Sequence, residues 1–209
     1  MNSIHSFTHV LTGFKATFHV YSDLKRFDKG NLKPIPPFIL NTEQGNETAV
    51  DRYINICYGK EWYRYPNSFF LDSTRYRMRF IKSDFKGQLP KLYENDARSG
   101  LMTHIIYADF NDINQEEISR YVKPEQCHYL IDTSQSIVSE LEPDYSKDVK
   151  TWTTLSSRKI LDLARSPPII RSFYLPYISE VYNSYNEYKL LRNNDLFVQS
   201  SETPGQRDR

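Results

Sequence analysis

The segment Arg52–Leu71, RYINICYGKEWYRYPNSFFL, indicates both the fold class and the place of a functional loop. Its first part alternates: Ile54, Ile56 and Tyr58 fall on one side and the intervening residues on the other, as in a β-strand with two different faces. Gly59 ends this run. The loop that follows mixes acid, base, aromatic rings and proline, a composition that suits a surface loop contacting a ligand.

Three further segments have strand patterns. Arg75–Ile81 alternates apolar residues with arginines, which would form either a solvated face or contacts to an anion such as phosphate. His104–Phe110 and Cys127–Thr133 contain nearly continuous apolar runs, which are typical of strands buried on both faces. We therefore expect an α/β fold, with a single domain built on a mixed, largely buried sheet of four to six strands, few helices and long loops.

The remaining segments are less regular. Ser3–Leu24 has apolar residues at roughly helical spacing. Thr151–Ala164 fits either a strand or a helix, and Ile169–Tyr188 fits either one long strand or a strand followed by a helix. Residues 193–209 are polar and contain proline and glycine, so we expect a disordered tail.

Composition limits the class of protein. The 209 residues carry a formal net charge of +1, so no basic footprint points to a nucleic-acid partner. No run approaches the length of a membrane-spanning helix. Taken alone, these properties predict a soluble cytosolic protein. Asn46 in a glycosylation sequon weakens that prediction. Cys57 and Cys127 fit either two small buried side chains or a disulfide between adjacent strands.

Catalytic motifs are scarce. The sequence has no G-x-S-x-G elbow, no Gly-rich phosphate loop and no cluster of ligands at metal spacing, so we expect no metal and no cofactor. Carboxylates are the remaining source of chemistry. Glu61 with Asp109 or Asp112 would suit a soluble glycosidase if they shared a cleft, and otherwise would act as caps and solvated loop residues.

Several blocks of the sequence resemble a known family, glycosyltransferase family 22, and specifically the C-terminal lumenal region of the α-1,2-mannosyltransferases of dolichol-linked oligosaccharide synthesis. The blocks follow the family's order, and the resemblance covers about Phe7–Leu190. They are GKEWYRYPNSFFL (Gly59–Leu71), SDFKGQLPK (Ser83–Lys91), DFNDINQEEISRY (Asp109–Tyr121), CHYLIDT (Cys127–Thr133), and LDLARS (Leu161–Ser166) with RSFYLPY (Arg171–Tyr177).

The resemblance implies a compartment and a division of labour. Members of this family are multi-pass endoplasmic reticulum (ER) membrane proteins whose catalytic acids lie in the first lumenal loop. This chain would then be the lumenal tail alone, held at the ER membrane through helices that it does not contain, and catalysing no transfer by itself. Residues 1–22 would follow the last membrane helix, 23–192 would form the lumenal α/β domain, and 193–209 the tail.

The resemblance also implies partners and site residues. The donor would be dolichyl-phosphate-mannose and the acceptor a dolichol-linked oligosaccharide. Trp62 or Tyr63 would stack on a sugar face while Glu61 and Arg64 contact hydroxyl or phosphate groups; alternatively, Glu61 and Arg64 pair and Trp62 fills the core. Gln88 and His128 complete the substrate-binding set. Asn46 would be exposed to glycosylation in the lumen, where a Cys57–Cys127 bridge is plausible but not required.

The same resemblance is compatible with a second function. A stand-alone lumenal glycan-binding module, derived from the enzyme, would use the same loop without any transfer. The soluble glycosidase is the third hypothesis.

Overall fold

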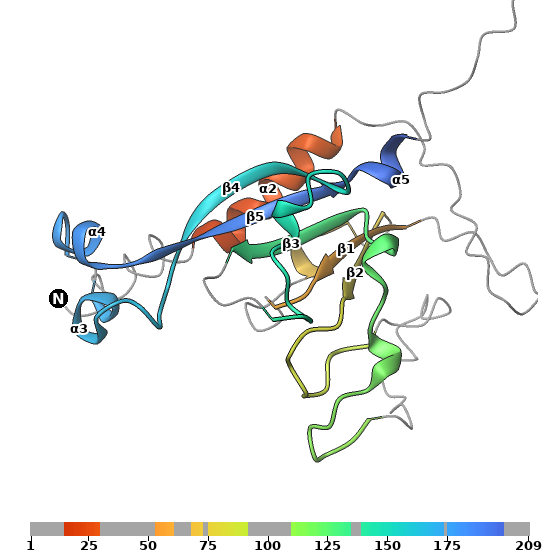
Figure 1. Ribbon diagram of the computed structural model, residues 1–209, viewed down its shortest axis with the longest axis horizontal. Helices are drawn as coiled ribbons and strands as arrows, with labels where there is room; N and C mark the ends of the chain where they lie inside the picture. The colour runs from red at the N-terminus through yellow and green to blue at the C-terminus, as the bar shows by residue number, and fades with distance from the viewer. Residues whose placement is uncertain are drawn as a thin grey trace, which may run out of the picture.

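A five-stranded mixed sheet forms the centre of the part of the chain that the computed structural model describes, which is residues 15–29, 53–60, 68–72, 75–91, 110–134, 139–173 and 175–198 (Figure 1). The strand order is β2-β1-β3-β5-β4. The strands are β1 Ile54–Tyr58, β2 Tyr76–Phe80, β3 Tyr129–Ser134, β4 Trp152–Leu161 and β5 Tyr185–Asn193. This arrangement confirms the predicted α/β class with a mixed sheet.

The direction of the strands divides the sheet into two parts. β1 runs parallel to both β2 and β3, whereas β5 runs antiparallel to β3 and β4. The α-helices are α2 Lys15–Lys29, α3 Pro168–Ser172, α4 Ile178–Tyr182 and α5 Asn194–Val198, and the 3-10 helices are η1 Ser68–Phe70, η4 Ile118–Arg120, η5 Pro124–Gln126 and η6 Tyr145–Lys147. Within the described ranges, no helix has the length and apolar character that crossing a bilayer requires.

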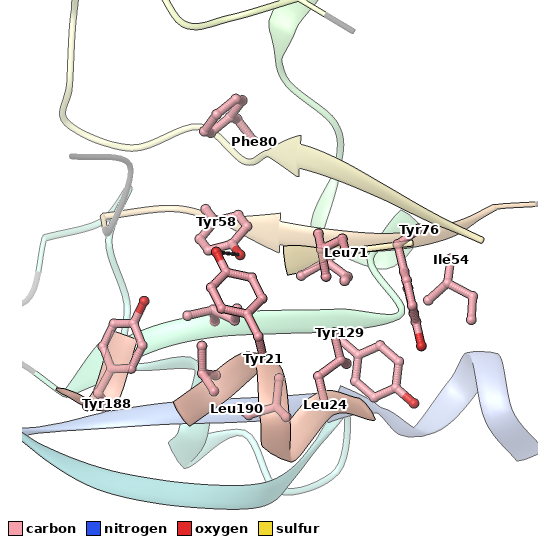
Figure 2. Packing of buried hydrophobic residues seen from close by; sticks show 14 of the residues in the cluster. Tyr21, Leu24, Ile54, Tyr58, Leu71, Tyr76, Phe80, Tyr129, Tyr188 and Leu190 are labelled. Carbon is pink, nitrogen blue, oxygen red and sulfur yellow. Dashed lines mark hydrogen bonds between the residues drawn. The ribbon is translucent and has the colours of Figure 1, made fainter. Parts of the chain in front are cut away.

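Helix α2 covers one face of the sheet. Its buried apolar residues recur at helical spacing, Ala16, Val20, Tyr21 and Leu24, so that one stripe of the helix faces the strands. Figure 2 shows Tyr21 reaching Tyr58 of β1, where the two hydroxyl oxygens are 2.9 Å apart. Burial raises the pKa of Tyr58 well above its ordinary value, so the Tyr58 hydroxyl keeps its proton at neutral pH.

Charged side chains also fasten α2 to the sheet. Arg158 of β4 donates from two nitrogens to the carboxylate of Asp23, each at 2.7 Å. Asp28 accepts from Arg75 Nε at 2.7 Å and from the Tyr76 hydroxyl at 2.5 Å. The hydrogen bonds from Arg158 lower the pKa of Asp23 despite its partial burial. The two aspartates therefore fix both the position and the rotation of the helix.

Arg75 and Arg77, in the predicted strand Arg75–Ile81, do not form the simple solvated face that was one of its two interpretations. Arg75 pairs with Asp28, and the guanidinium of Arg77 lies 3.7 Å from the ring centre of Tyr53, a close cation–π contact. Both side chains are only partly exposed, because neighbouring segments cover them.

The other face of the sheet holds a disulfide between Cys57 of β1 and Cys127, which follows η5 and lies two residues before β3. Leu130, Trp152 and Leu191 surround it, and all of them are buried. The bond links two segments that are 70 residues apart. It thus joins the parallel central strands at a point where their ladder has only three pairs.

The segment Ile169–Tyr188 differs from prediction. Instead of one long strand, or a strand followed by a helix, the chain forms α3 and α4 first and enters β5 only at Tyr185. Pro168 occupies the first turn of α3, where a missing N–H is harmless and its fixed φ favours a helix. The ambiguous segment Thr151–Ala164 is resolved as a strand, since its β-branched residues lie in β4.

Some predictions concern residues that the structure does not describe, and others concern the domain boundaries. His104–Asp109 lie outside the described residues, and Phe110 is not in a strand. Helix α2 runs across the predicted boundary between residues 22 and 23, and α5 begins just after the predicted start of the tail at 193. The origin of residues 1–14 and the state of 199–209 remain predictions.

The disulfide yields a stability prediction. Replacing both cysteines with alanine should lower the free energy of unfolding by about 2 to 4 kcal/mol, because a long closed loop is released in the unfolded chain. Denaturant unfolding of the wild type and the Cys57→Ala/Cys127→Ala variant, each with and without reductant, measures this. Reductant should destabilise the wild type and leave the variant unchanged; equal stability of all four samples would contradict the assignment.

Candidate functional site

The carboxyl ends of the three parallel strands place several polar segments close together. In a parallel arrangement these ends meet on one side of the sheet, where ligands of α/β proteins commonly bind. Lys60 follows β1, the segment 81–91 follows β2, and the segment 139–147 lies beyond β3. Figure 1 shows the long connections after β2 and before β3 projecting together from the sheet.

A buried ion pair lies at the centre of this region. Lys60 Nζ is 3.2 Å from the Asp132 carboxylate, and each side chain is only 4% exposed. The ammonium group also donates to the Pro143 carbonyl at 3.0 Å. Because a buried charge without partners is strongly disfavoured, these contacts hold Lys60 in one position. The chain is therefore held in place directly after β1.

Hydrogen bonds among Asp144, Ser146 and Lys189 extend the cluster toward β5. Asp144 accepts from the Ser146 hydroxyl at 2.6 Å and from its N–H at 3.2 Å. Lys189 Nζ donates to the Ser146 hydroxyl at 2.9 Å. Burial alone would raise the pKa of Asp144, but the Ser146 hydrogen bonds and the charges of Lys189 and Lys60 outweigh it and lower that pKa.

Asp132 titrates differently from Asp144. Burial raises the pKa of Asp132 to about 6, although the charge and hydrogen bond of Lys60 oppose the shift. Its carboxyl group therefore changes charge close to neutral pH. Since the folded-state pKa is above the unfolded value of about 4, the stability that this group contributes is greatest in acid and is lost as the pH rises toward 6.

The loop after β2 is tied to the segment that precedes η4. Gln88 N–H donates to the Asn114 side-chain oxygen at 3.0 Å, and Asn111 N–H donates to Gln88 Oε1 at 3.3 Å. Lys82 pairs with Glu116, which also accepts from the Tyr121 hydroxyl at 3.2 Å. These amides and carboxylates hold the two segments against each other, and Leu89 and Phe85 of the first segment and Tyr121 of the second pack on the core.

A small pocket of about 150 Å³ opens beside this loop. It lies against the edge strand β2 and is rich in basic side chains. Its lining residues are Met78, Arg79, Phe80, Pro90, Lys91, Ser119 and Arg120. Guanidinium and ammonium groups donate hydrogen bonds to hydroxyl or phosphate oxygens. We refer to Lys60, Gln88, Lys91, Asp132 and Asp144, with this pocket, as the carboxyl-end site.

The structure describes some of the predicted substrate-binding residues and not others. Glu61, Trp62, Tyr63 and Arg64 lie outside the described residues, and the preceding residue, Lys60, is paired with Asp132. Gln88 lies in the carboxyl-end site. Asn46 and Asp109 are also outside the described residues, and Asp112 is exposed, so the carboxylate pair of a glycosidase remains untested.

His128 lies at the other end of the parallel strands. It is buried, and its Nδ1 accepts the N–H of Asn55 near the start of β1 at 3.1 Å. The structure therefore does not bring His128 together with Gln88. Its position is that of a residue that joins β1 to β3.

Asp132 and Lys189 were missed by sequence reasoning. The sequence did contain a clue to Asp132. It directly follows the apolar residues Tyr129, Leu130 and Ile131 of a strand expected to be buried on both faces, and a buried charge needs a partner. The partner could not be named, since Lys60 lies 72 positions earlier, a separation given by 132 minus 60. Among the residues the structure covers, no three His, Cys, Asp or Glu side chains gather in a way that would hold a metal ion.

Comparisons with known proteins found relatives of a single kind. The chain is 43% identical over 141 residues to "Alpha-1,2-mannosyltransferase ALG9" of Homo sapiens, which is 68% of this chain and 22% of the human protein. It is 36% identical over 168 residues to "Alpha-1,2-mannosyltransferase algn-9" of Caenorhabditis elegans, covering 75% of this chain and 28% of that protein.

A relative from a fungus has the same name. "Alpha-1,2-mannosyltransferase alg9" of Schizosaccharomyces pombe is 36% identical over 146 residues, covering 66% of this chain and 25% of that protein. The chain thus spans about a quarter of the length of these curated relatives. No protein-family model matches the chain, and no solved structure matches it.

The charge cluster yields a titration prediction. The Asp132 carboxyl carbon, followed by NMR, should titrate with a midpoint near 6, and the Lys60→Met variant should move that midpoint upward because the opposing positive charge is lost. The exposed Lys147→Met variant serves as the matched control and should leave it unchanged. A wild-type midpoint near 4 would show that Asp132 is not buried in this cluster.

Proposed function

This chain is homologous to part of the alpha-1,2-mannosyltransferases named ALG9, and from that premise we propose that it forms the C-terminal lumenal domain of such an enzyme. The enzyme would transfer mannose from dolichyl-phosphate-mannose to a lipid-linked oligosaccharide during N-glycan precursor synthesis. The observation that carries the proposal is the shared name of relatives from animals, fungi and a plant.

The domain would act on the acceptor and leave bond formation to another part of the enzyme. An oligosaccharide is a neutral polyol, which proteins recognise through charged and amide hydrogen bonds to adjacent hydroxyls and through aromatic faces. The carboxyl-end site offers the Gln88 amide and the Lys91, Arg79 and Arg120 cations beside a pocket. The loop with Glu61, Trp62, Tyr63 and Arg64 would add the aromatic platform.

The buried Lys60–Asp132 pair supports this role indirectly. It fixes the first residue before that loop, so the loop's side chains would be presented from a rigid base. Neither Lys60 nor Asp132 is exposed enough to contact a sugar. We assign them as positioning residues, and Glu61, Trp62, Tyr63 and Arg64 would make the contacts.

The compartment follows from the same premise. The domain would face the ER lumen, attached to the membrane through helices elsewhere in the enzyme, and the donor would bind there as well. The Cys57–Cys127 disulfide agrees with an oxidising compartment, because such bonds persist in the ER and are rare in the cytosol. Asn46 would then be available for glycosylation.

A domain exchange tests the function. The matching region of human ALG9 should be replaced by this chain and expressed in cells that lack the human enzyme. We expect the chimera to restore full-length lipid-linked oligosaccharides, analysed by chromatography, whereas the human enzyme with the region deleted should not. A chimera that is glycosylated and membrane-inserted but inactive would argue against the assignment.

The loop contacts yield a kinetic prediction. In the active chimera, Arg64→Glu should lower kcat/KM for the acceptor about tenfold to a hundredfold, the loss that follows from removing a charged hydrogen bond. Lys150→Glu, the same charge reversal at an exposed lysine, is the control.

The same series separates the two roles of Arg64. If Glu61 and Arg64 only pair with each other, the exchange Glu61→Arg/Arg64→Glu should restore activity. Contact with the acceptor instead predicts that the exchange remains impaired.

A further inference from the structure

The helices α3 and α4 expose an unusual number of apolar side chains. They lie between the end of β4 and the start of β5, pack on each other, and project beyond the rest of the sheet (Figure 1). Ile169 and Val181 are each 75% exposed and Tyr177 is 84% exposed. Together with Phe173, Ile178 and Tyr182, which are also exposed, they form what we call the apolar tip.

The backbone of the tip is strained where its most exposed ring is displayed. Tyr177 has φ 67° and ψ −44°, and Ile178 N–H donates to the Pro176 carbonyl at 2.8 Å. This is a γ-turn with positive φ, a rare and strained conformation for a bulky residue. Strain of this kind persists at sites where a side chain must be held in one place.

A basic pocket opens beside the tip. Its volume is about 540 Å³, and it lies between α2, β4 and α4. Lys15, His19, Arg158 and Lys159 line it together with one acid, Glu180. Arg158 is already paired with Asp23, whereas Lys15 and Lys159 form no ion pair among the described residues. Helix α4 connects the two features, because Glu180 lines the pocket while its neighbours Val181 and Tyr182 are exposed.

We propose that the apolar tip and the basic pocket together form a docking site for the surface of an anionic lipid bilayer. The aromatic and aliphatic side chains of the tip would enter the interface between headgroups and acyl chains, where tyrosine rings are favoured. Lys15 and Lys159 would meet the lipid phosphates. The site is separate from the carboxyl-end site, and the proposal does not depend on the proposed function.

Charge favours a lipid surface over a second copy of the chain. Two copies related by symmetry would bring the same basic pockets toward each other, which like charges oppose. An anionic bilayer instead complements the lysines and also covers the apolar tip. The combination of interfacial aromatic residues with basic residues is the pattern of proteins that lie on membranes.

Vesicle flotation tests the proposal with the whole chain. We expect the chain to float with phosphatidylcholine vesicles that contain phosphatidylserine, and weakly with phosphatidylcholine alone. Lys15→Gln/Lys159→Gln should weaken binding to the anionic vesicles roughly 20- to 30-fold, since each lysine contributes about fivefold. Lys147→Gln/Lys150→Gln, two exposed lysines away from the pocket, is the matched control.

A second pair of variants tests the apolar tip. Val181→Asp should reduce binding to both kinds of vesicle at least tenfold, whereas Val149→Asp, at a valine that is also largely exposed but far from the tip in sequence, should not. Circular dichroism checks that each variant is folded. Absence of wild-type binding, or equal effects of tip and control variants, would overturn the proposal. So would an oligomer in sedimentation that only Val181→Asp disrupts.

Tyr177→Gly separates binding from folding. Glycine adopts positive φ without strain, so this variant should melt at a temperature equal to or above that of the wild type. Its binding to anionic vesicles should nevertheless fall several-fold, because an exposed ring is lost. A variant that is more stable and still binds normally would show that the Tyr177 ring takes no part in docking.

Discussion

The burial of β1 and β3 on both faces is the constraint on which the rest of the structure depends. α2 covers one side through Val20, Tyr21 and Leu24, and the Cys57–Cys127 disulfide lies on the other side. The parallel ladder between the two strands is short, with three residue pairs. The disulfide and the packing of both faces therefore compensate for the few hydrogen bonds that hold these strands together.

That burial determines how the charged residues at the carboxyl ends of β1 and β3 are paired. Lys60 and Asp132 lie in or next to buried strands, so neither charge can reach bulk water and each must use the other. Their pairing holds the chain in place at the end of β1. Asp144, Ser146 and Lys189 continue the polar network to β5. In this way a requirement of folding also fixes the chain at Lys60, the last described residue before Glu61.

The register of the sheet relates the carboxyl-end site to the apolar tip. Ser134, at the carboxyl end of β3, pairs with Glu187, close to the start of β5 and therefore to α4. The two features lie toward the same end of the sheet, on different strands. If the tip docks on a bilayer, the carboxyl-end site would also lie near that surface. A sugar chain attached to a lipid would be accessible there, which connects the two proposals without making either depend on the other.

Sequence reasoning succeeded where the pattern is local. Alternation in Ile54–Tyr58 and Arg75–Ile81 and the apolar run at Tyr129–Ile131 identified three strands, and with them the fold class. It failed for Ile169–Tyr188, because a run of apolar residues predicts burial and these side chains are exposed on two short helices. It also missed the partner of Asp132, since contacts between distant segments depend on the strand order, which no local pattern contains.

The most direct test of the central claim is an NMR titration of the isotope-labelled chain with a soluble mannose oligosaccharide. We predict that the amide signals of Lys60, Gln88, Lys91 and Asn111 shift in proportion to added sugar, while those of Asn55 and His128 at the other end of the strands do not. Shifts confined to the His128 end, or none at millimolar sugar, would contradict the proposal that the carboxyl-end site recognises the acceptor.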